Sequence, residues 1–357
     1  MKDKKSLTIR DIAGAAGVSP ATVSLVLNGK GDISGETRAR VLEAVANLNY
    51  VPRTARNRPD TSSKLRFLKI AKHGHTVNRD HNIFISDYID GMSSEATRRG
   101  YTLEVVSHDG MSAGAIAETL AGAPVSGVIA LGTELSEADV RVIQSPGLPT
   151  VFIDTFYDVI DANFVNMNNG DAVYKALARL KQQGFERIGF VASHVETTNF
   201  RLRQEAFHEN MARLGLPVDE AYVISVESTY DGAYADARAL LESGIELAEC
   251  YFCTNDVIAY GFIKALKEFD VRIPEDVSII GFDNLPMSST MEPALTTIDV
   301  SKRKIGYLAV TVLDDLINAS EAQPSVKILV GADLIARDSD IRSSGVAHSA
   351  RETLAKA

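Results

Sequence analysis

The chain has 357 residues, of which 45% are hydrophobic, and its formal net charge is −10. This length predicts two or three globular domains. The sequence contains no apolar run of the roughly 18 residues that a membrane-spanning helix needs, which argues against such a helix. The charged residues 1–5 are not followed by an apolar segment, so no secretory signal peptide is expected and a cytoplasmic protein is predicted.

The first predicted element is a helix between Thr8 and Gly17. Thr8 can cap its amino end, and Asp11, three residues later, completes a capping box. Gly17 ends the helix and permits a tight turn. The apolar residues of this helix fall on one face, which consists of Ile9, Ile12, Ala13 and Ala16.

A second helix is predicted from Pro20 to Asn28, and a third helix follows it. Ser19 is a suitable N-cap for the second helix, and Ser34 is one for the third. Two short helices joined by a glycine turn predict a helix-turn-helix, whose second helix enters the major groove of DNA. The second and third helices can complete a small core with the apolar residues Val23, Val26, Leu27, Val41, Leu42, Val45 and Leu48.

The alternative for this region is an ordinary three-helix piece of a larger core, and two features favour DNA binding instead. Residues 1–60 contain ten lysine or arginine residues and only six acidic ones, so the remainder of this acidic chain is strongly negative. The second helix also carries small and polar residues, which allow a phosphate backbone to approach closely: Ser19, Ala21, Thr22 and Ser24.

The second helix and its flanks read V-S-P-A-T-V-S-L-V-L-N-G, and the third helix continues as V-L-E-A-V-A-N-L-N-Y-V-P. These two segments resemble the DNA-binding head of the lactose-repressor (LacI) family of bacterial transcriptional regulators. The resemblance implies a head at residues 1–52 in which Pro20, Ala21 and Leu25 read bases, while nearby polar residues contact phosphates. The expected DNA-contacting residues are Thr8, Ser19, Pro20, Ala21, Thr22, Ser24, Leu25, Asn28, Arg53 and Arg56.

Residues 53–63 form a basic linker that is rich in helix breakers. In the family, this region becomes a hinge helix on DNA, and a leucine opens the minor groove. The family pattern N-x-x-A-R-x-L is not met here, because Arg53 replaces the asparagine, Pro59 interrupts a helix and no leucine occurs before Leu65. Two interpretations stay open: a short helix over residues 53–58 whose arginines reach phosphates or the minor groove, and a disordered basic linker.

Beyond residue 63, segments typical of strands and helices alternate. This alternation predicts parallel, doubly wound sheets, and the number of strands suits two sheets better than one. Helices are predicted, for example, at residues 169–183 and 203–214. Strands are predicted at residues 67–71, 101–106, 128–131, 151–154, 187–192, 222–226, 250–254 and 277–282.

The resemblance to the family extends to about residue 338. Its motifs include Q-G-F-E-R-I-G-F at residues 183–190, T-N-D at 254–256 and I-P-E-D-V-S-I-I-G-F-D at 273–283. It implies a body at residues 64–342 with the two-lobe α/β architecture of type I periplasmic binding proteins. The expected lobes are residues 64–165 plus 294–325 and residues 166–293 plus 326–340, followed by a flexible tail at 343–357.

Polar residues just past the predicted strand ends are candidates for ligand binding, because ligands of doubly wound sheets lie outside the carboxyl ends of strands. Carboxylate, amide and guanidinium groups suit a hydroxyl-rich molecule, since each hydroxyl both donates and accepts hydrogen bonds. The resemblance implies effector contacts at Asp154, Arg203, Asn255 and Asp283. The expected effector-binding residues are Lys72, His73, Phe84, Asp154, Arg203, Tyr230, Asn255 and Asp283.

Some of these assignments have alternatives. Phe84 and Tyr230 are suited to stacking on a sugar face, but Phe84 also fits a core position. Asp256 follows a predicted strand end as well, and a helix cap is its favoured role. His73 and His75 lie two residues apart, which makes a metal site conceivable, although a loop that contacts the effector is favoured.

Cys250 and Cys253 form the pattern C-x-x-C, which is also found in redox and zinc sites. They fall in a predicted buried strand, where residues three apart point to opposite faces, and no second cysteine pair completes a zinc site. Buried structural cysteines are therefore the favoured interpretation. We expect no metal, cofactor or catalytic residue.

Taken together, the sequence predicts a repressor of carbohydrate-utilisation genes. One small head supplies too little specificity, so a homodimer on a near-palindromic operator is expected, with operator affinity controlled by a sugar. A transport-type sugar-binding protein is a rival, disfavoured by the head and the missing signal peptide. An α/β enzyme is a second rival, disfavoured because G-x-G-x-x-G and G-x-x-x-x-G-K-[ST] are absent.

Overall fold

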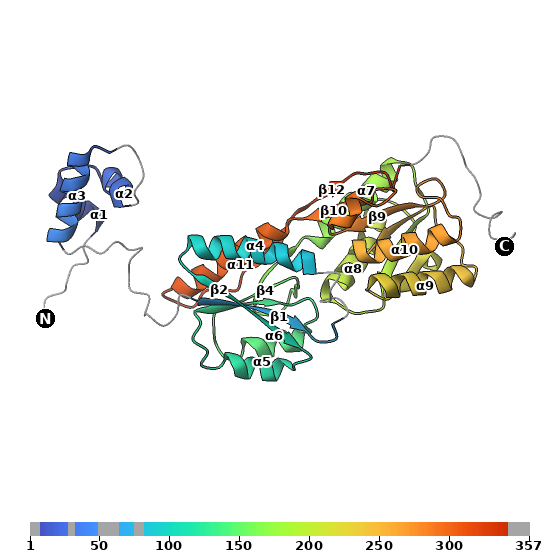
Figure 1. Cartoon of the computed structure of the whole chain (residues 1–357), viewed down its shortest axis with the longest axis horizontal. Coiled ribbons are helices and arrows are strands. Elements are labelled where there is room, and N and C mark those ends of the chain that lie inside the picture. The colour runs from blue at the N-terminus through green and yellow to red at the C-terminus, as the bar shows by residue number, and fades with distance from the viewer. Residues whose placement is uncertain (1–7, 28–32, 49–63, 75–81, 342–357) are drawn as a thin grey trace. The chain divides into compact units, whose positions relative to one another are not determined.

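The computed structural model describes residues 8–27, 33–48, 64–74 and 82–341, and the chain divides into two compact units at residue 62 (Figure 1). We refer to these units as the head and the body. The predictions for Asn28, the linker 53–63, His75 and the tail 343–357 lie outside the described residues. None of the helices in the described ranges is long and apolar enough to cross a membrane.

The described residues of the head form three helices, α1 (Ile9–Ala16), α2 (Pro20–Leu27) and α3 (Gly35–Asn47). The carboxylate of Asp11 accepts hydrogen bonds from the backbone N–H and the hydroxyl of Thr8, both over 2.7 Å. Gly17 ends α1 in the left-handed conformation, with φ at +63°. The hydroxyl of Ser19 accepts the backbone N–H of Thr22 over 3.1 Å. The predicted caps and the glycine turn of the helix-turn-helix are therefore confirmed.

A small core holds the head together, and two of the residues predicted for it are instead exposed. Leu42 is 50% exposed and Ile9 is 36% exposed. Successive residues of a helix are rotated by about 100°, so Leu42 turns away from the face on which its neighbour Val41 packs. The buried core consists of Ile12, Ala13, Ala16, Val23, Val26, Val41 and Ala44.

The first lobe of the body is built on a six-stranded sheet with the strand order β11-β5-β4-β3-β1-β2. All its neighbouring strands are parallel. The strands are β1 (Lys64–Ala71), β2 (Thr102–Asp109), β3 (Gly127–Leu131), β4 (Thr150–Ile153), β5 (Asn163–Met167) and β11 (Lys327–Val330). The helices are α4 (Asn82–Arg98), α5 (Ala113–Leu120), α6 (Glu137–Gln144) and α11 (Lys302–Asn318).

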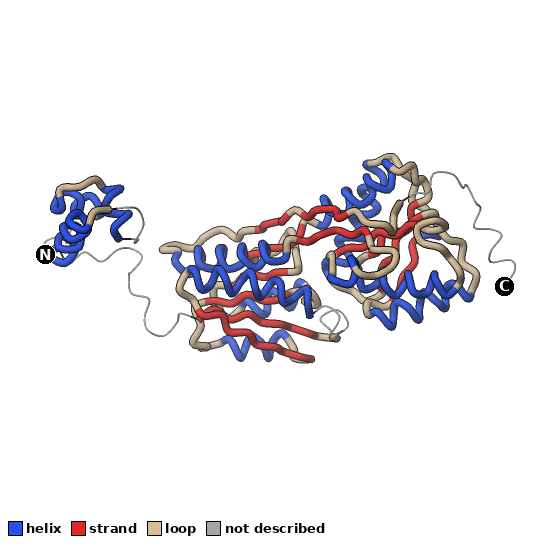
Figure 2. The backbone as a smooth tube through the Cα atoms, turned by 45° about the horizontal axis from the view of Figure 1, so that its top comes forward, coloured by secondary structure: helices blue, strands red, loops and turns tan. Residues whose placement is uncertain are grey.

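The second lobe repeats this plan with the strand order β12-β10-β9-β8-β6-β7, in which only β12 is antiparallel to its neighbour. Helices cover both faces of each sheet (Figure 2). The strands are β6 (Ile188–Ser193), β7 (Val223–Val226), β8 (Cys250–Cys253), β9 (Ser278–Phe282), β10 (Thr296–Val300) and β12 (Ala332–Ile335). The helices are α7 (Asn169–Gln182), α8 (Thr198–Arg213), α9 (Tyr230–Glu242), α10 (Asp256–Glu268) and the short η3 (Glu220–Tyr222) and η4 (Pro286–Ser289).

The fold class predicted from the sequence is thus confirmed, but the division of the chain between the lobes differs in two places. Residues 294–325 were expected in the first lobe, yet β10 belongs to the second sheet. Residues 326–340 were expected in the second lobe, yet β11 belongs to the first sheet. The chain crosses between the lobes after β5, β10 and β11. A short run of apolar residues in the sequence predicts that a strand forms there. It does not predict which other strand that strand pairs with, and so it does not fix the lobe to which the strand belongs.

Helices α4 and α11 approach each other closely, and glycines on both helices permit this contact. A Cβ atom on Gly91 would lie 2.1 Å from the carbonyl oxygen of Arg303. A Cβ atom on Gly306 would lie 2.2 Å from the carbonyl oxygen of Tyr88. Larger residues would separate the two helices. The close contact fixes Tyr88, which reaches the region between the lobes.

Candidate functional site

The exposed face of α2 carries the residues that were expected to read DNA. Val23 and Val26 are buried in the core of the head, while Pro20, Ala21 and Leu25 point away from it. Leu25 is 39% exposed, although it is a large apolar residue. An exposed leucine on a short helix is suited to apolar contact with a thymine methyl group.

We predict that Leu25→Arg changes the preferred operator at one base pair in each half-site. Arginine donates two hydrogen bonds to guanine, whereas leucine offers only apolar contact. Selection of bound sequences from random DNA measures the preference. Leu42→Arg is the control, because it adds the same charge at an exposed leucine of α3. It should strengthen binding to DNA without changing the preferred base pair. An unchanged preference in Leu25→Arg would remove Leu25 from the base-reading residues.

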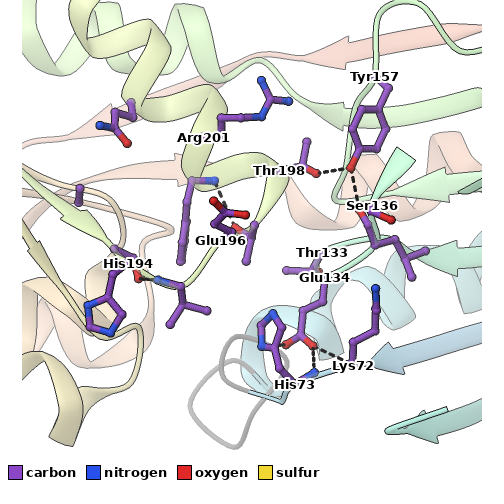
Figure 3. A pocket seen from close by; sticks show the side chains of 17 residues that line it. Lys72, His73, Thr133, Glu134, Ser136, Tyr157, His194, Glu196, Thr198 and Arg201 are labelled. Carbon is purple, nitrogen blue, oxygen red and sulfur yellow. Dashed lines mark hydrogen bonds and ion pairs between the residues drawn. The ribbon is translucent and has the colours of Figure 1, made fainter. Parts of the chain in front are cut away.

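The body contains a cavity of about 600 Å³ between its two lobes (Figure 3). Its first-lobe wall follows the carboxyl ends of β1, β3 and β4, and its second-lobe wall follows the end of β6 and the start of α8. Its lining consists of Lys72, His73, Thr133, Glu134, Leu135, Ser136, Tyr157, Ala192, Ser193, His194, Val195, Glu196, Thr197, Thr198, Phe200, Arg201 and Gln204. The cavity is therefore at the strand ends where the sequence placed the ligand site.

A direct hydrogen bond joins the two walls at this cavity. The hydroxyl of Tyr157, in the first lobe, donates to the carbonyl oxygen of Leu135 over 2.7 Å. The hydroxyl oxygen of Tyr157 in turn accepts a hydrogen bond from the hydroxyl of Thr198, in the second lobe, over 3.0 Å (Figure 3). Any change in the angle between the lobes must stretch or break this bond. The hydrogen bond of Tyr157 therefore depends on the relative position of the two lobes.

A buried polar cluster lies next to the cavity and also joins the lobes. The carboxylate of Asp154, after β4, accepts hydrogen bonds from the hydroxyls of Tyr88 and Thr133, the former over 2.9 Å. Asn199 of α8 donates to the same carboxylate over 3.0 Å. Thr133 also lines the cavity, so this residue connects the cavity wall to Asp154.

Arg203 lies at the second-lobe side of the cluster, in the same helix as Asn199. Its guanidinium donates to the carbonyl oxygen of Thr254 over 2.8 Å and to the side-chain oxygen of Asn169 over 3.0 Å. It lies 3.7 Å from the centre of the Phe282 ring and 3.6 Å from an oxygen of Asp283. That oxygen of Asp283 is buried and has no hydrogen-bond partner among the residues that the structure describes.

Asp154 and Asp283 occupy equivalent places in the two lobes, because β4 and β9 correspond in the two strand orders. Both residues have positive φ angles, 59° and 110°, which are strained for residues other than glycine. Burial raises the pKa of Asp154, and hydrogen bonds from Thr133 and Tyr88 oppose the rise. Burial raises the pKa of Asp283 to about 7, and the facing Arg203 limits this rise. Two strained, buried carboxyl groups therefore flank the boundary between the lobes.

The structure brings five of the eight expected effector residues to this region. Lys72 and His73 line the cavity, and Asp154, Arg203 and Asp283 form the cluster next to it.

The other three expected effector residues do not line this cavity. Asn255 caps α10 by accepting the N–H of Ile258 over 2.9 Å. Phe84 is buried, and its ring contacts that of Tyr88. Tyr230 lines a separate cavity, together with Met287 of η4 and several residues of α10. Their positions next to strand ends or helix starts did not determine which cavity they face.

Asp256 has a different role from the helix cap that the sequence favoured. Its carboxylate accepts the N–H of Leu285 over 2.8 Å and the hydroxyls of Ser288 and Thr297, each over 2.6 Å. It therefore ties α10 to η4 and β10. The cap that the sequence placed here is supplied by Asn255. Cys250 and Cys253 are both buried in β8, as expected, and no disulfide joins them.

The residues that the sequence analysis missed follow two strands that it had located correctly. Thr133 and Glu134 come just after β3, and His194 and Glu196 come just after β6. The rule that polar residues past strand ends line the site would have found them. No group of three or more histidine, cysteine or acidic side chains suited to a metal occurs within the described part of the chain.

Comparisons with known proteins agree with this architecture. Residues 8–53 match the family "Bacterial regulatory proteins, lacI family", and residues 177–339 match "Periplasmic binding protein-like domain". The ribose operon repressor of Escherichia coli (strain K12) is 30% identical over 312 residues, which cover 86% of this chain and 92% of the relative. The HTH-type transcriptional repressor PurR of Haemophilus influenzae is 30% identical over 340 residues, which cover 93% and 98%.

Solved structures show the same fold. A complex of the transcriptional regulator CelR with cellobiose has a TM-score of 0.70 at 24% identity and covers 93% of this chain and 99% of that one. The lac repressor dimer bound to operator and the anti-inducer ONPF has a TM-score of 0.69 at 23% identity and covers 95% and 100%. With a helix-turn-helix head and relatives that match over nearly their whole length, this chain belongs to the lacI family of bacterial regulatory proteins and is a DNA-binding transcriptional regulator.

Proposed function

We propose that the protein is a dimeric cytoplasmic repressor of carbohydrate-utilisation genes, controlled by a sugar bound between the lobes of its body. The interlobe cavity carries this proposal. Its lining presents hydroxyl, amide, imidazole and carboxylate groups, and Tyr157 and Phe200 add aromatic surface. This mixture suits a molecule that is rich in hydroxyl groups and has apolar faces. The protein binds the sugar and has no catalytic role.

The cavity offers a physical link between sugar and operator. A sugar that contacts both walls favours one angle between the lobes, and Tyr157 and Thr198 form a bond that depends on this angle. In a dimer, the angle changes the spacing of the two heads, and sugar and operator affinities are coupled reciprocally. Release of the operator on sugar binding is the direction that we propose. Named relatives and neighbours support the ligand class, since they include a ribose operon repressor and a regulator complexed with cellobiose.

Melting of the full-length protein in the presence of neutral mono- and disaccharides, with purines for comparison, tests the proposal. One sugar should stabilise the protein saturably, by about 2.7 kcal/mol at 100 times its dissociation constant. The same sugar should weaken binding to an operator selected from random DNA. A purine that stabilises the protein when no sugar does, or turnover of the stabilising sugar, would contradict the proposal.

Two tyrosine variants separate lobe coupling from simple binding. Tyr157→Phe removes the hydroxyl between the lobes and should reduce the effect of the sugar on operator affinity. Tyr174→Phe makes the same change at an exposed tyrosine of α7 and should leave the effect unchanged. Equal effects of the two variants would exclude Tyr157 from the coupling.

A further inference from the structure

Three consecutive backbone N–H groups in the cavity wall point at a single oxygen. The N–H groups of Lys72, His73 and Gly74 donate to Oε2 of Glu134 over 2.7, 3.0 and 3.2 Å. Gly74 has φ at +73°, a left-handed conformation that favours glycine. Successive N–H groups that converge in this way form a nest, the backbone arrangement that binds carboxylate and phosphate oxygens.

The protein fills this nest with its own anion. Glu134 comes from the segment after β3, and its side chain is completely buried. Its second oxygen, Oε1, lies 3.5 Å from Nδ1 of His73 (Figure 3). Hydrogen bonds to a charged acceptor are about twice as strong as neutral ones, so the carboxylate is well held. A ligand that enters the cavity finds the anion position occupied.

The remaining basic side chains of the cavity also face carboxylates. Nζ of Lys72 lies 2.7 Å from Asp139, and a guanidinium nitrogen of Arg201 lies 2.7 Å from Glu205. His194 lies 3.9 Å from an oxygen of Asp236. Each basic side chain that lines the described cavity thus has an acidic neighbour. An anionic ligand would have to displace one of these carboxylates before it could form an ion pair with a basic side chain of the cavity.

We propose that Glu134 makes the effector site selective against anions, so that the effector is an uncharged polyol and not a sugar acid or sugar phosphate. The inference rests on the proposed function in taking the interlobe cavity as the effector site. Glu134 acts as a specificity residue in two ways. It occupies the nest at residues 72–74, and it repels a second negative charge at that place.

Glu134→Ala in the full-length chain tests the inference with inorganic phosphate as the probe. The variant vacates the nest, so phosphate should bind at least about tenfold more tightly than it binds the unaltered protein. Calorimetry, and melting in phosphate against chloride of equal ionic strength, measure this gain. Glu196→Ala removes a carboxylate from the opposite wall, away from the nest, and should show no comparable gain.

Each outcome decides the inference. Phosphate binding in Glu134→Ala, but not in Glu196→Ala, supports it. A folded Glu134→Ala protein without the gain overturns it, whatever sugar the unaltered protein binds. If Glu134→Ala does not fold, Glu134→Gln decides: its neutral amide is displaced by phosphate more easily than the carboxylate, and an unchanged phosphate affinity overturns the inference. A phosphate gain without any sugar response would instead contradict the proposed function and leave the nest assignment standing.

Discussion

Replacing Arg203 by alanine is expected to lower the free energy of unfolding by about 3–5 kcal/mol, because the change leaves buried charge without its partner. The guanidinium faces Asp283, lies over the Phe282 ring and donates to Thr254 and Asn169. Its loss removes the cation nearest to the buried carboxyl groups of the cluster. Denaturant unfolding of the full-length protein, followed by circular dichroism, measures the effect.

Arg201→Ala is the matched control, because Arg201 precedes Arg203 in α8 by only two residues. Its ion pair with Glu205 is about half exposed, so its loss should change stability by no more than about 0.5 kcal/mol. The double variant Arg203→Met with Asp283→Asn should recover part of the lost stability, since both charges are then absent. A loss below about 1 kcal/mol in Arg203→Ala would contradict the view that this arginine balances the buried carboxyl groups.

Asp283→Asn is expected to flatten the decline of stability with rising pH. Burial raises the pKa of Asp283 to about 7, above the value of about 3.9 for an unfolded aspartate. The folded protein therefore keeps a proton that the unfolded chain releases between these pH values. The contribution of this group is complete below about pH 4 and is lost as the pH rises through 7, by roughly 2–4 kcal/mol in total.

Unfolding free energies between pH 4 and pH 8 measure this dependence. Burial also raises the pKa of Asp256 to about 6 and that of Asp154 in the same direction, so the variant should keep part of the slope. Asp158→Asn makes the same substitution at an exposed residue and should leave the slope as it is in the unaltered protein. An Asp283→Asn protein with the original slope would show that Asp283 is ionised throughout this range.

Much of the fold could be predicted from the sequence, because its signals are local. The capping residues Thr8 and Ser19 and the turn at Gly17 act within a few residues of the chain, and the structure confirms them. The strands of the body are short apolar runs, and their alternation with helices predicts the mostly parallel sheets that the structure shows. The family resemblance placed Leu25 among the base-reading residues, and its exposure on α2 is consistent with that role.

Tertiary structure decided the parts that depend on partners distant in the sequence. Pairing placed β10 in the second sheet and β11 in the first, because strand pairing depends on what each strand meets after the chain has crossed between lobes. Glu134 reaches a nest about 60 residues away in sequence, and Arg203 meets Asp283 from another element. The sequence by itself therefore determined the family, the helix-turn-helix with its exposed second helix, and the position of the interlobe cavity at the strand ends. Only the folded structure determined which charged side chains face one another at these strand ends. The interaction of two charges depends on their distance in space, and the sequence gives only their distance along the chain.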